Sequence, residues 1–266
     1  MKYFLSTELR NKFSILLQKK MLLAFDLDGT LSPLVSDPLA ARISDDTYRL
    51  LCELNNLNRQ SRLAHTGHRL AIITGRSISD TRRIINDRSI LIIGNHGLES
   101  PFFNQEIKAR WKKRCREIKK KLQENLSLED CFLEDKKYSL SIHFTNKKRV
   151  RAKLNLLGKV QREYLSLIQG LLSKEETVVL GKNVINILPA EGVTKGLVVT
   201  KLIAKYRLSG ALFVGDDCTD ETVFRLRNKN IIKIRVGRSL SSSANYYLRS
   251  QKEINRLLKF LSSVNL

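Results

Sequence analysis

The sequence predicts an α/β protein in which a doubly wound, mainly parallel sheet is interrupted by a second, smaller α/β domain. Short, nearly continuous apolar runs are each followed by a polar turn and a helical pattern, which is typical of parallel strands buried on both faces. This pattern stops near Pro101, gives way to alternating apolar and polar residues, and resumes after Pro189. We therefore expect a core made of residues 1–100 and 189–266 and an inserted domain of residues 101–188.

The first half of the core alternates between expected strands and helices. Met21–Phe25 is a run of five apolar residues, which suits a buried strand. Ser44 can cap the next helix, and Ser77 and Asp80 have the spacing of a capping box. The expected elements in chain order are a helix over 5–19, a strand over 21–25, a helix over 44–57, a loop over 58–67, a strand over 70–73, a helix over 77–85 and a strand over 90–93.

The inserted domain has a different pattern. Leu140, Ile142 and Phe144 alternate with polar residues, which predicts a strand with one exposed face. Helices are expected over 106–125 and 147–172, and strands over 138–144, 177–180 and 184–188. The core then resumes with a helix over 194–205, a strand over 211–214, a helix capped by Thr219, a strand over 231–236 and a helix over 250–262.

Composition narrows the class of protein. With 266 residues, 42% of them hydrophobic, the chain can bury a substantial core. The four cysteines are widely spaced and form no CxxC pair, so neither a disulfide framework nor a structural zinc site is indicated. No apolar run approaches the roughly 20 residues that span a bilayer, and the first residues lack a signal-type apolar core. We expect a cytoplasmic protein with no membrane partner. A monomer is favoured, but the sequence does not determine the oligomeric state.

The formal net charge of +22 stands out. It is concentrated in the inserted domain, where residues 108–121 contain nine Lys or Arg and one acidic residue. Such charge would suit nucleic acid, anionic lipid or a phosphorylated small molecule, but it also suits solvated faces of basic helices. Among these basic residues Trp111 is the one aromatic residue, so the stacking surface of a single-strand binder is missing. No specific nucleic-acid partner is expected.

Polar residues follow three of the expected strands, and ligands of open parallel sheets bind at the carboxyl ends of strands. These residues are Asp26 and Asp28 after the strand at 21–25, Thr74 and Gly75 after the strand at 70–73, and Asp216, Asp217 and Asp220 after the strand at 211–214. A lone Asp-x-Asp is more often a turn, but three coincident strand ends favour a site. Converging carboxylates repel one another, so a cation is required, and Mg²⁺ suits an all-oxygen ligand set.

The same residues suit phosphoryl transfer. Asp26 is anionic at pH 7 and could attack a phosphorus atom, forming an acyl phosphate that water then hydrolyses. Asp28 would have to carry a proton for the leaving alcohol, with its side chain turned away from the metal. The Thr74 hydroxyl and the Gly75 amide, at a helix start, can bind phosphoryl oxygens, and Lys195 is the expected buried countercharge.

These motifs resemble a known family. DLDGTLSP, ITGRS, Lys195-Gly196 and GDDCTDE resemble, in order and context, the four motifs of haloacid-dehalogenase-superfamily phosphatases. Closer details are similar to the trehalose-6-phosphate phosphatases: Ser36-Asp37-Pro38, Asn95-His96-Gly97-Leu98-Glu99, Pro189 before Thr194-Lys195-Gly196, and Asp216-Asp217-x-Thr219-Asp220-Glu221. The resemblance implies hydrolysis of trehalose 6-phosphate in trehalose biosynthesis, with a sugar phosphate as the small-molecule partner.

The resemblance also implies roles for individual residues. Asp26 would be the nucleophile and Asp28 the general acid and base, with Thr74 and Lys195 on the phosphate. Mg²⁺ would be held by Asp26, the backbone carbonyl of Asp28 and Asp216, while Asp217 and Asp220 would orient the metal's waters or Lys195. The inserted domain would be the cap that closes over the sugar.

The substrate has alternatives. The family usually carries an acidic and a basic residue before the proline, where this chain reads Asn186-Ile187-Leu188-Pro189. Another sugar phosphate or a glycosyl phosphoglycerate is therefore the second hypothesis. A nucleic-acid or anion binder built on the same core is the third, although pure binding would not need the complete set of catalytic motifs. Arg110, Lys112 and His143 are candidates for sugar contacts; the competing interpretations are a charged helix face and an edge-strand histidine.

Overall fold

The computed structural model describes residues 1–35, 37–63, 67–126, 131–144, 154–181, 184–190 and 193–264. The chain divides into two compact units. The larger unit is made of residues 1–97 and 194–266, and the smaller unit of residues 98–193. No helix within the described ranges is long and apolar enough to cross a membrane.

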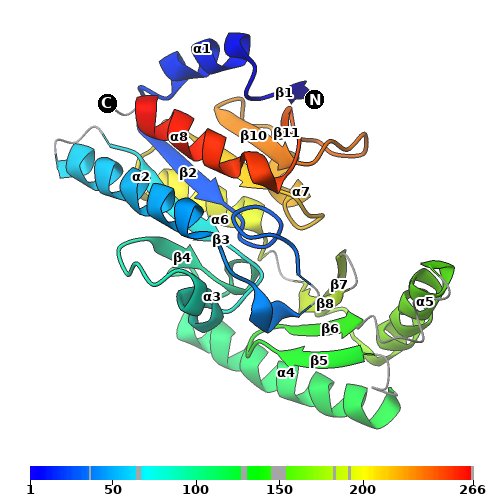
Figure 1. Ribbon diagram of the computed structural model, residues 1–266. Coiled ribbons are helices and arrows are strands. Elements are labelled where there is room, and N and C mark those ends of the chain that lie inside the picture. Colours follow the sequence, from blue (N-terminus) through cyan, green and yellow to red (C-terminus); the bar gives the residue numbers. More distant parts are fainter. Residues whose placement is uncertain are drawn as a thin grey trace. The chain divides into compact units, whose positions relative to one another are not determined.

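The larger unit contains a seven-stranded sheet in which every pairing is parallel (Figure 1). Its strand order is β1-β11-β10-β9-β2-β3-β4. The strands are β1 Lys2–Tyr3, β2 Met21–Phe25, β3 Arg69–Ile73, β4 Leu91–Ile93, β9 Gly210–Gly215, β10 Ile231–Val236 and β11 Tyr246–Leu248. Strands β3 and β4 follow β2 in the chain and lie on one side of it in the sheet. Strand β9 comes later in the chain and pairs with the other side of β2. The order therefore switches between β2 and β9, which is where ligands of such sheets bind.

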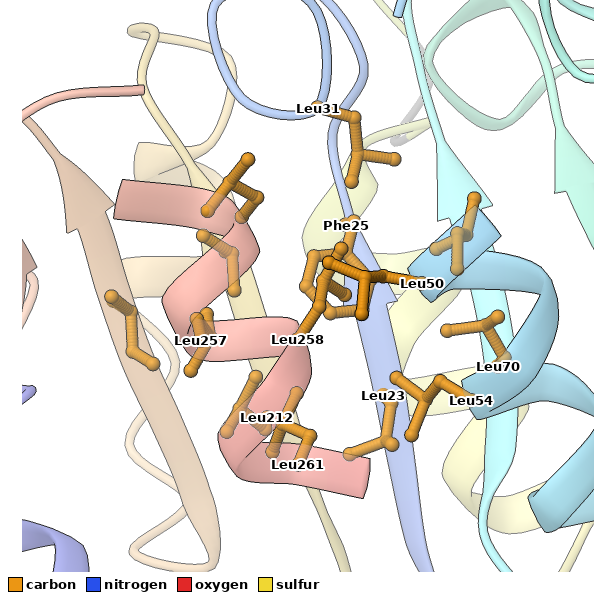
Figure 2. Packing of buried hydrophobic residues seen from close by; sticks show 14 of the residues in the cluster. Leu23, Phe25, Leu31, Leu50, Leu54, Leu70, Leu212, Leu257, Leu258 and Leu261 are labelled. Atoms are coloured by element: carbon orange, nitrogen blue, oxygen red, sulfur yellow. The ribbon is translucent and has the colours of Figure 1, made fainter. Parts of the chain in front are cut away.

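Helices bury both faces of β2. Leu23 and Phe25 pack against α2 and α8 in one hydrophobic cluster (Figure 2), while Leu22 and Ala24 are buried on the opposite face and α6 also contacts β2. This explains why the strand is apolar at every position. The helices of the larger unit are α1 Thr7–Leu16, α2 Asp45–Leu63, α3 Ile78–Ile84, α6 Lys195–Lys205, α7 Glu221–Phe224 and α8 Ile254–Val264, with short 3₁₀ segments at Pro38–Ala40, Asn95–Gly97 and Gln251–Glu253.

The smaller unit is a four-stranded antiparallel sheet with two helices. Its strand order is β5-β6-β8-β7, and Leu140 and Ile142 of β6 are fully buried against the helices, as their alternation predicts. The elements are α4 Gln105–Asn125, β5 Cys131–Asp135, β6 Leu140–Phe144, α5 Leu154–Leu171, β7 Glu176–Gly181 and β8 Val184–Pro189. The start of the helix expected over 147–172 lies outside the described residues. The prediction of a mainly parallel α/β core with a smaller α/β unit is thus confirmed at the level of fold class.

Some element predictions are wrong. The stretch 58–67 was expected to be a loop because it is polar, but α2 continues to Leu63. Asn55 and Asn58 are buried, and the Asn55 amide donates hydrogen bonds to Asp87 and Ser89, so tertiary packing holds the helix together. Three short strands, β1, β5 and β11, were not predicted.

Helix α7 also begins later than expected. Asp220, not Thr219, occupies the N-cap position, and its side chain makes no capping hydrogen bond. That carboxylate is engaged elsewhere, as described below.

Candidate active site

Asp26 is the first residue after β2 and lies beside the end of β9. Its backbone N–H donates to the carbonyl of Val214 over 2.9 Å, which continues the pairing of the two strands by one residue. The side chain is 7% exposed. Because parallel strands place their carboxyl ends at one edge, the end of β2 lies beside the end of β9 and the turn that begins at Asp216.

Lys195 supplies a buried positive charge to this edge. It is the first residue of α6, whose N-cap Thr194 accepts a hydrogen bond from the Leu197 amide. Its Nζ lies 2.9 Å from Asp26 Oδ1 and 2.8 Å from Asp220 Oδ1. Burial alone would lower the pKa of Lys195, but the two carboxylates outweigh it and raise the pKa above its ordinary value, so the lysine is charged.

Three carboxylates converge here. One oxygen from each of Asp26, Asp216 and Asp220 lies within 4.8 Å of the others. Burial and the neighbouring carboxylates raise the pKa of Asp26 well above its usual range and the pKa of Asp216 to about 7. The positive charge of Lys195 lowers both pKa values but does not outweigh these effects. Mutual repulsion of this kind is what a bound cation relieves, and an all-oxygen donor set fits a hard divalent ion.

Asp220 organises the turn after β9. Its Oδ1 faces Lys195, while its Oδ2 accepts hydrogen bonds of 2.9 Å from the backbone N–H groups of both Asp216 and Asp217. The carboxylate therefore fixes the loop that carries Asp216. The Asp217 side chain instead accepts from the amide of Cys218 and is not part of the three-carboxylate cluster.

Two glycines allow the carboxylates to come this close. Gly29 has φ +80°, and a Cβ placed there would lie 2.1 Å from an Asp216 carboxylate oxygen. A Cβ at Gly215 would lie 2.3 Å from the Asp220 carboxyl carbon. The glycines of the two acidic motifs are thus required by packing against the aspartates of the site.

Asp28 points to a different partner. Its two carboxylate oxygens accept hydrogen bonds from Arg76 Nε at 2.6 Å and Arg76 Nη2 at 2.8 Å. It is not part of the three-carboxylate cluster found among the described residues. Arg76 was not among the residues predicted for the site; its position within the Thr74-Gly75-Arg76-Ser77 turn was the available signal.

Thr74 and Gly75 lie in the turn after β3, but not at a helix start as expected. Helix α3 begins at Ile78 with Ser77 as its N-cap, so Gly75 precedes the cap by two residues. Thr74 is buried, and its Oγ1 accepts from the Arg76 amide at 3.2 Å. A Cβ at Gly75 would lie 2.5 Å from the His96 ring, which packs directly on this turn.

The three residues suggested for sugar contacts lie in the smaller unit. Arg110 and Lys112 are exposed on α4. His143 lies on β6, which is flanked by β5 and β8, so the interpretation as an edge-strand histidine is wrong. Its Nε2 lies 2.7 Å from a Glu134 carboxylate oxygen, and its ring stacks on Phe132 with centroids 5.5 Å apart.

The parallel sheet, the carboxylates at the ends of β2 and β9 and the buried lysine of α6 define the class: a phosphatase-type fold of the haloacid-dehalogenase superfamily. Solved structures agree at the level of fold. The C-terminal domain of a Candida albicans trehalose-6-phosphate phosphatase superposes with a TM-score of 0.75 at 22% identity, covering 96% of this chain and 97% of that one. An Aspergillus fumigatus trehalose-6-phosphate phosphatase superposes with a TM-score of 0.62 at 24% identity, covering 99% of both chains.

The chain belongs to the trehalose-phosphatase family, whose model matches residues 24–252. Trehalose-phosphate phosphatase B of Arabidopsis thaliana is 25% identical in an alignment of 270 positions, which covers 91% of this chain and 66% of the relative. The chain thus spans about two thirds of that protein's length. The family predicted from the sequence motifs is confirmed.

Proposed function

We propose that this protein is a Mg²⁺-dependent phosphatase that hydrolyses trehalose 6-phosphate to trehalose and inorganic phosphate. The observation that carries the proposal is the contact between Asp26 and Lys195 inside the three-carboxylate cluster, in a chain of the trehalose-phosphatase family. These contacts support the assignment of a nucleophile, a countercharge and oxygen ligands for a cation to one strand edge.

The reaction proceeds in two displacements at phosphorus. An Asp26 carboxylate oxygen bonds to phosphorus while the bond from phosphorus to the sugar oxygen breaks, and Asp28 gives its proton to that oxygen. Water then attacks the aspartyl phosphate, Asp28 takes the proton from the water, and the bond from phosphorus to Asp26 breaks. The reaction ends with free trehalose, inorganic phosphate and the original enzyme.

The phosphoryl group would be bound by Lys195, the Thr74 hydroxyl and the Gly75 amide. The Lys195 ammonium group lies 2.9 Å from Asp26 Oδ1. A phosphoryl group attacked by Asp26 would therefore come close to this positive charge, which would stabilise its oxygens. Thr74 is held in a turn whose backbone is tied to the loop after β4, since the His96 amide donates to the Thr74 carbonyl over 2.9 Å. Preorganised donors of this kind need little rearrangement during the reaction.

Mg²⁺ would be held by Asp26, Asp216 and the backbone carbonyl of Asp28. The fit rests on charge and chemistry, because three ionised carboxylates around one ammonium group carry two uncompensated negative charges, and burial together with their repulsion raises the pKa values of Asp26 and Asp216. When bound, the ion supplies the positive charge that lets a phosphate dianion approach this acidic edge. Asp220 would keep Lys195 and the Asp216 loop in place, and Asp217 would orient waters of the ion.

The smaller unit, residues 98–193, is proposed as the cap that selects the sugar. Its sheet carries a polar group of side chains that includes Ser141, Glu134 and His143, and Ser141 donates a 2.7 Å hydrogen bond to Asn186. Arg110 and Lys112 on α4 remain candidates for additional sugar contacts.

A phosphate-release assay over a panel of esters tests this proposal. The panel contains trehalose 6-phosphate, glucose 6-phosphate, sucrose 6-phosphate and a glucosyl phosphoglycerate, each with Mg²⁺. The expected result is a kcat/KM for trehalose 6-phosphate that exceeds every other value by at least about 100-fold, or about 2.7 kcal/mol of transition-state discrimination. A higher kcat/KM for another ester would support the phosphatase activity but assign a different sugar phosphate as the substrate. If no ester releases phosphate, the proposal is contradicted.

A further inference from the structure

We infer that Arg76 is a positioning residue for Asp28: it holds the proton-carrying carboxylate apart from the metal-binding aspartates and directs it to the leaving oxygen. The inference rests on the proposed phosphatase function. It assigns a role in this reaction to a residue of the turn after β3 whose side chain has no role in the proposed mechanism above.

The contact is a two-point fork. Arg76 Nε and Nη2 donate to the two different oxygens of Asp28 at 2.6 and 2.8 Å. The arginine side chain is 13% exposed and the aspartate side chain 31%, so the pair is partly shielded from solvent. A bidentate guanidinium–carboxylate pair fixes the plane of the carboxylate as well as its distance, which a lysine could not do.

The arginine itself is held by backbone contacts. Its amide donates to Thr74 Oγ1 at 3.2 Å, and its carbonyl accepts from the Asn95 amide at 2.8 Å. Asn95 and His96 adopt left-handed φ angles of +49° and +55°, so the loop after β4 is shaped to pack on this turn. Hydrogen bonds therefore fix the backbone of Arg76 in the same turn that carries the proposed phosphate-binding groups.

Without the two hydrogen bonds from Arg76, the Asp28 carboxylate could bind the metal ion instead. Asp28 lies two residues from Asp26, and the cation proposed at Asp26 and Asp216 would attract its carboxylate. A carboxylate bound to the cation cannot deliver a proton to the sugar oxygen. Arg76 offers Asp28 a competing partner, and its several N–H donors let it keep one contact when Asp28 carries the proton.

The dependence on the leaving group separates this role from a structural one. A sugar alkoxide is a poor leaving group and needs a proton as the bond to phosphorus breaks, whereas 4-nitrophenolate leaves without one. The measured quantity is kcat/KM, which reports the first displacement, for trehalose 6-phosphate and for 4-nitrophenyl phosphate. The enzymes compared are the wild type, Arg76→Met, Arg76→Lys, Asp28→Asn and the Arg76→Met/Asp28→Asn double variant, with Arg83→Met as control because Arg83 is an exposed arginine of α3.

We expect Arg76→Met to reduce kcat/KM for trehalose 6-phosphate at least about tenfold more than for 4-nitrophenyl phosphate, as Asp28→Asn does. Arg76→Lys should recover part of the loss. In the Asp28→Asn background, Arg76→Met should cost less than about threefold, because the two residues act as a unit. Arg83→Met should match the wild type on both substrates.

The inference would be overturned if Arg76→Met reduced kcat/KM equally for both substrates, or if the losses from Arg76→Met and Asp28→Asn were fully additive in the double variant. Neither result would contradict the proposed phosphatase function. Melting temperatures of all variants show which losses arise from unfolding, and Arg76→Lys preserves the charge if Arg76→Met does not fold. If the wild type rejects trehalose 6-phosphate, the alkyl ester that it accepts in the panel takes its place. If the wild type releases phosphate from no ester, the proposed function fails, and the role of Arg76 fails with it.

Discussion

Lys195 Nζ lies 2.8 Å from Asp220 Oδ1, and the two side chains are only 2% and 0% exposed. The same ammonium group contacts Asp26 at 2.9 Å, so one buried cation holds two carboxylates from different strand ends. A charge buried in this way stabilises the fold only while its partners remain.

Replacing Lys195 should therefore damage both stability and activity. We expect Lys195→Met to lower the free energy of unfolding at pH 7.5 by about 3–5 kcal/mol, because it leaves two buried carboxylates without a countercharge. Phosphate release should fall at least about 10³-fold. Urea denaturation measures the first effect, and Lys195→Met/Asp220→Asn should recover part of the stability but none of the activity. Lys229→Met, at an exposed position, is the control.

The tight packing at Gly29 predicts a local effect of one methyl group. Gly29→Ala places a Cβ against the Asp216 carboxylate at a positive φ, so we expect a loss of about 1–3 kcal/mol in stability and a larger loss in activity. The same substitution at Gly170 meets no atom within 4 Å and lies in α5, so it should stabilise by about 0.5–1 kcal/mol. Unfolding curves of both variants that shift in the same direction would contradict this account of Gly29.

A divalent ion at the three-carboxylate cluster should stabilise the fold as well as support activity. EDTA should abolish phosphate release and Mg²⁺ should restore it. At a Mg²⁺ concentration about 100 times Kd, binding adds about 2.7 kcal/mol, which corresponds to a rise of several degrees in the melting temperature. Asp216→Asn should lose most of this rise. Hydrolysis that continues in EDTA would contradict the assignment of the ligands.

The pair of Glu134 and His143 predicts a pH dependence of stability in the smaller unit. Burial alone would raise the pKa of Glu134, but the hydrogen bond with His143 and the charge of Lys136 lower it to about 2, against an ordinary value of 4.5. A lowered pKa stabilises the folded state above pH 4.5, and this stabilisation is lost as the pH falls toward 2. The loss should reach about 3 kcal/mol.

Urea denaturation of the wild type and of Glu134→Gln between pH 6 and pH 2.5 tests this expectation. The difference in stability between the two proteins should be largest at pH 6 and shrink on acidification. Glu124→Gln is a matched control, because Glu124 forms an exposed pair with Lys120 at 3.8 Å. A constant difference across the range would show that the Glu134 contact does not lower its pKa.

The sequence was sufficient to predict the fold class. It also predicted that carboxylates from two strand ends converge, and Asp26, Asp216 and Asp220 do so, whereas Asp28 and Asp217 do not. Strands such as β2 are apolar at every position because both faces are buried, and this pattern is visible without a structure. Asp26 and Asp216 could be placed at one edge because parallel strands bring their carboxyl ends together, a geometric rule that needs no side-chain detail. Lys195, at the start of α6, was predicted instead as the countercharge that these carboxylates require.

Other features could not be predicted because they depend on packing between distant segments. Asn55 of α2 bonds to Asp87 and Ser89, more than 30 residues away in the chain, and Asn58, in the polar stretch expected to be a loop, is buried. The pairing of Asp28 with Arg76 depends on the rotamer of a long side chain and on the loop after β4. Short strands such as β11, with three residues, carry too little pattern to be recognised alone.

The central claim is that Asp26 attacks the phosphorus of trehalose 6-phosphate. The most direct test is the rate of phosphate release from this ester, with Mg²⁺, by the wild type and by Asp26→Asn at equal concentration, with the fold of the variant verified by circular dichroism. We expect rapid release by the wild type and less than about one part in a thousand of that rate for Asp26→Asn. Substantial turnover by a folded Asp26→Asn would contradict the claim.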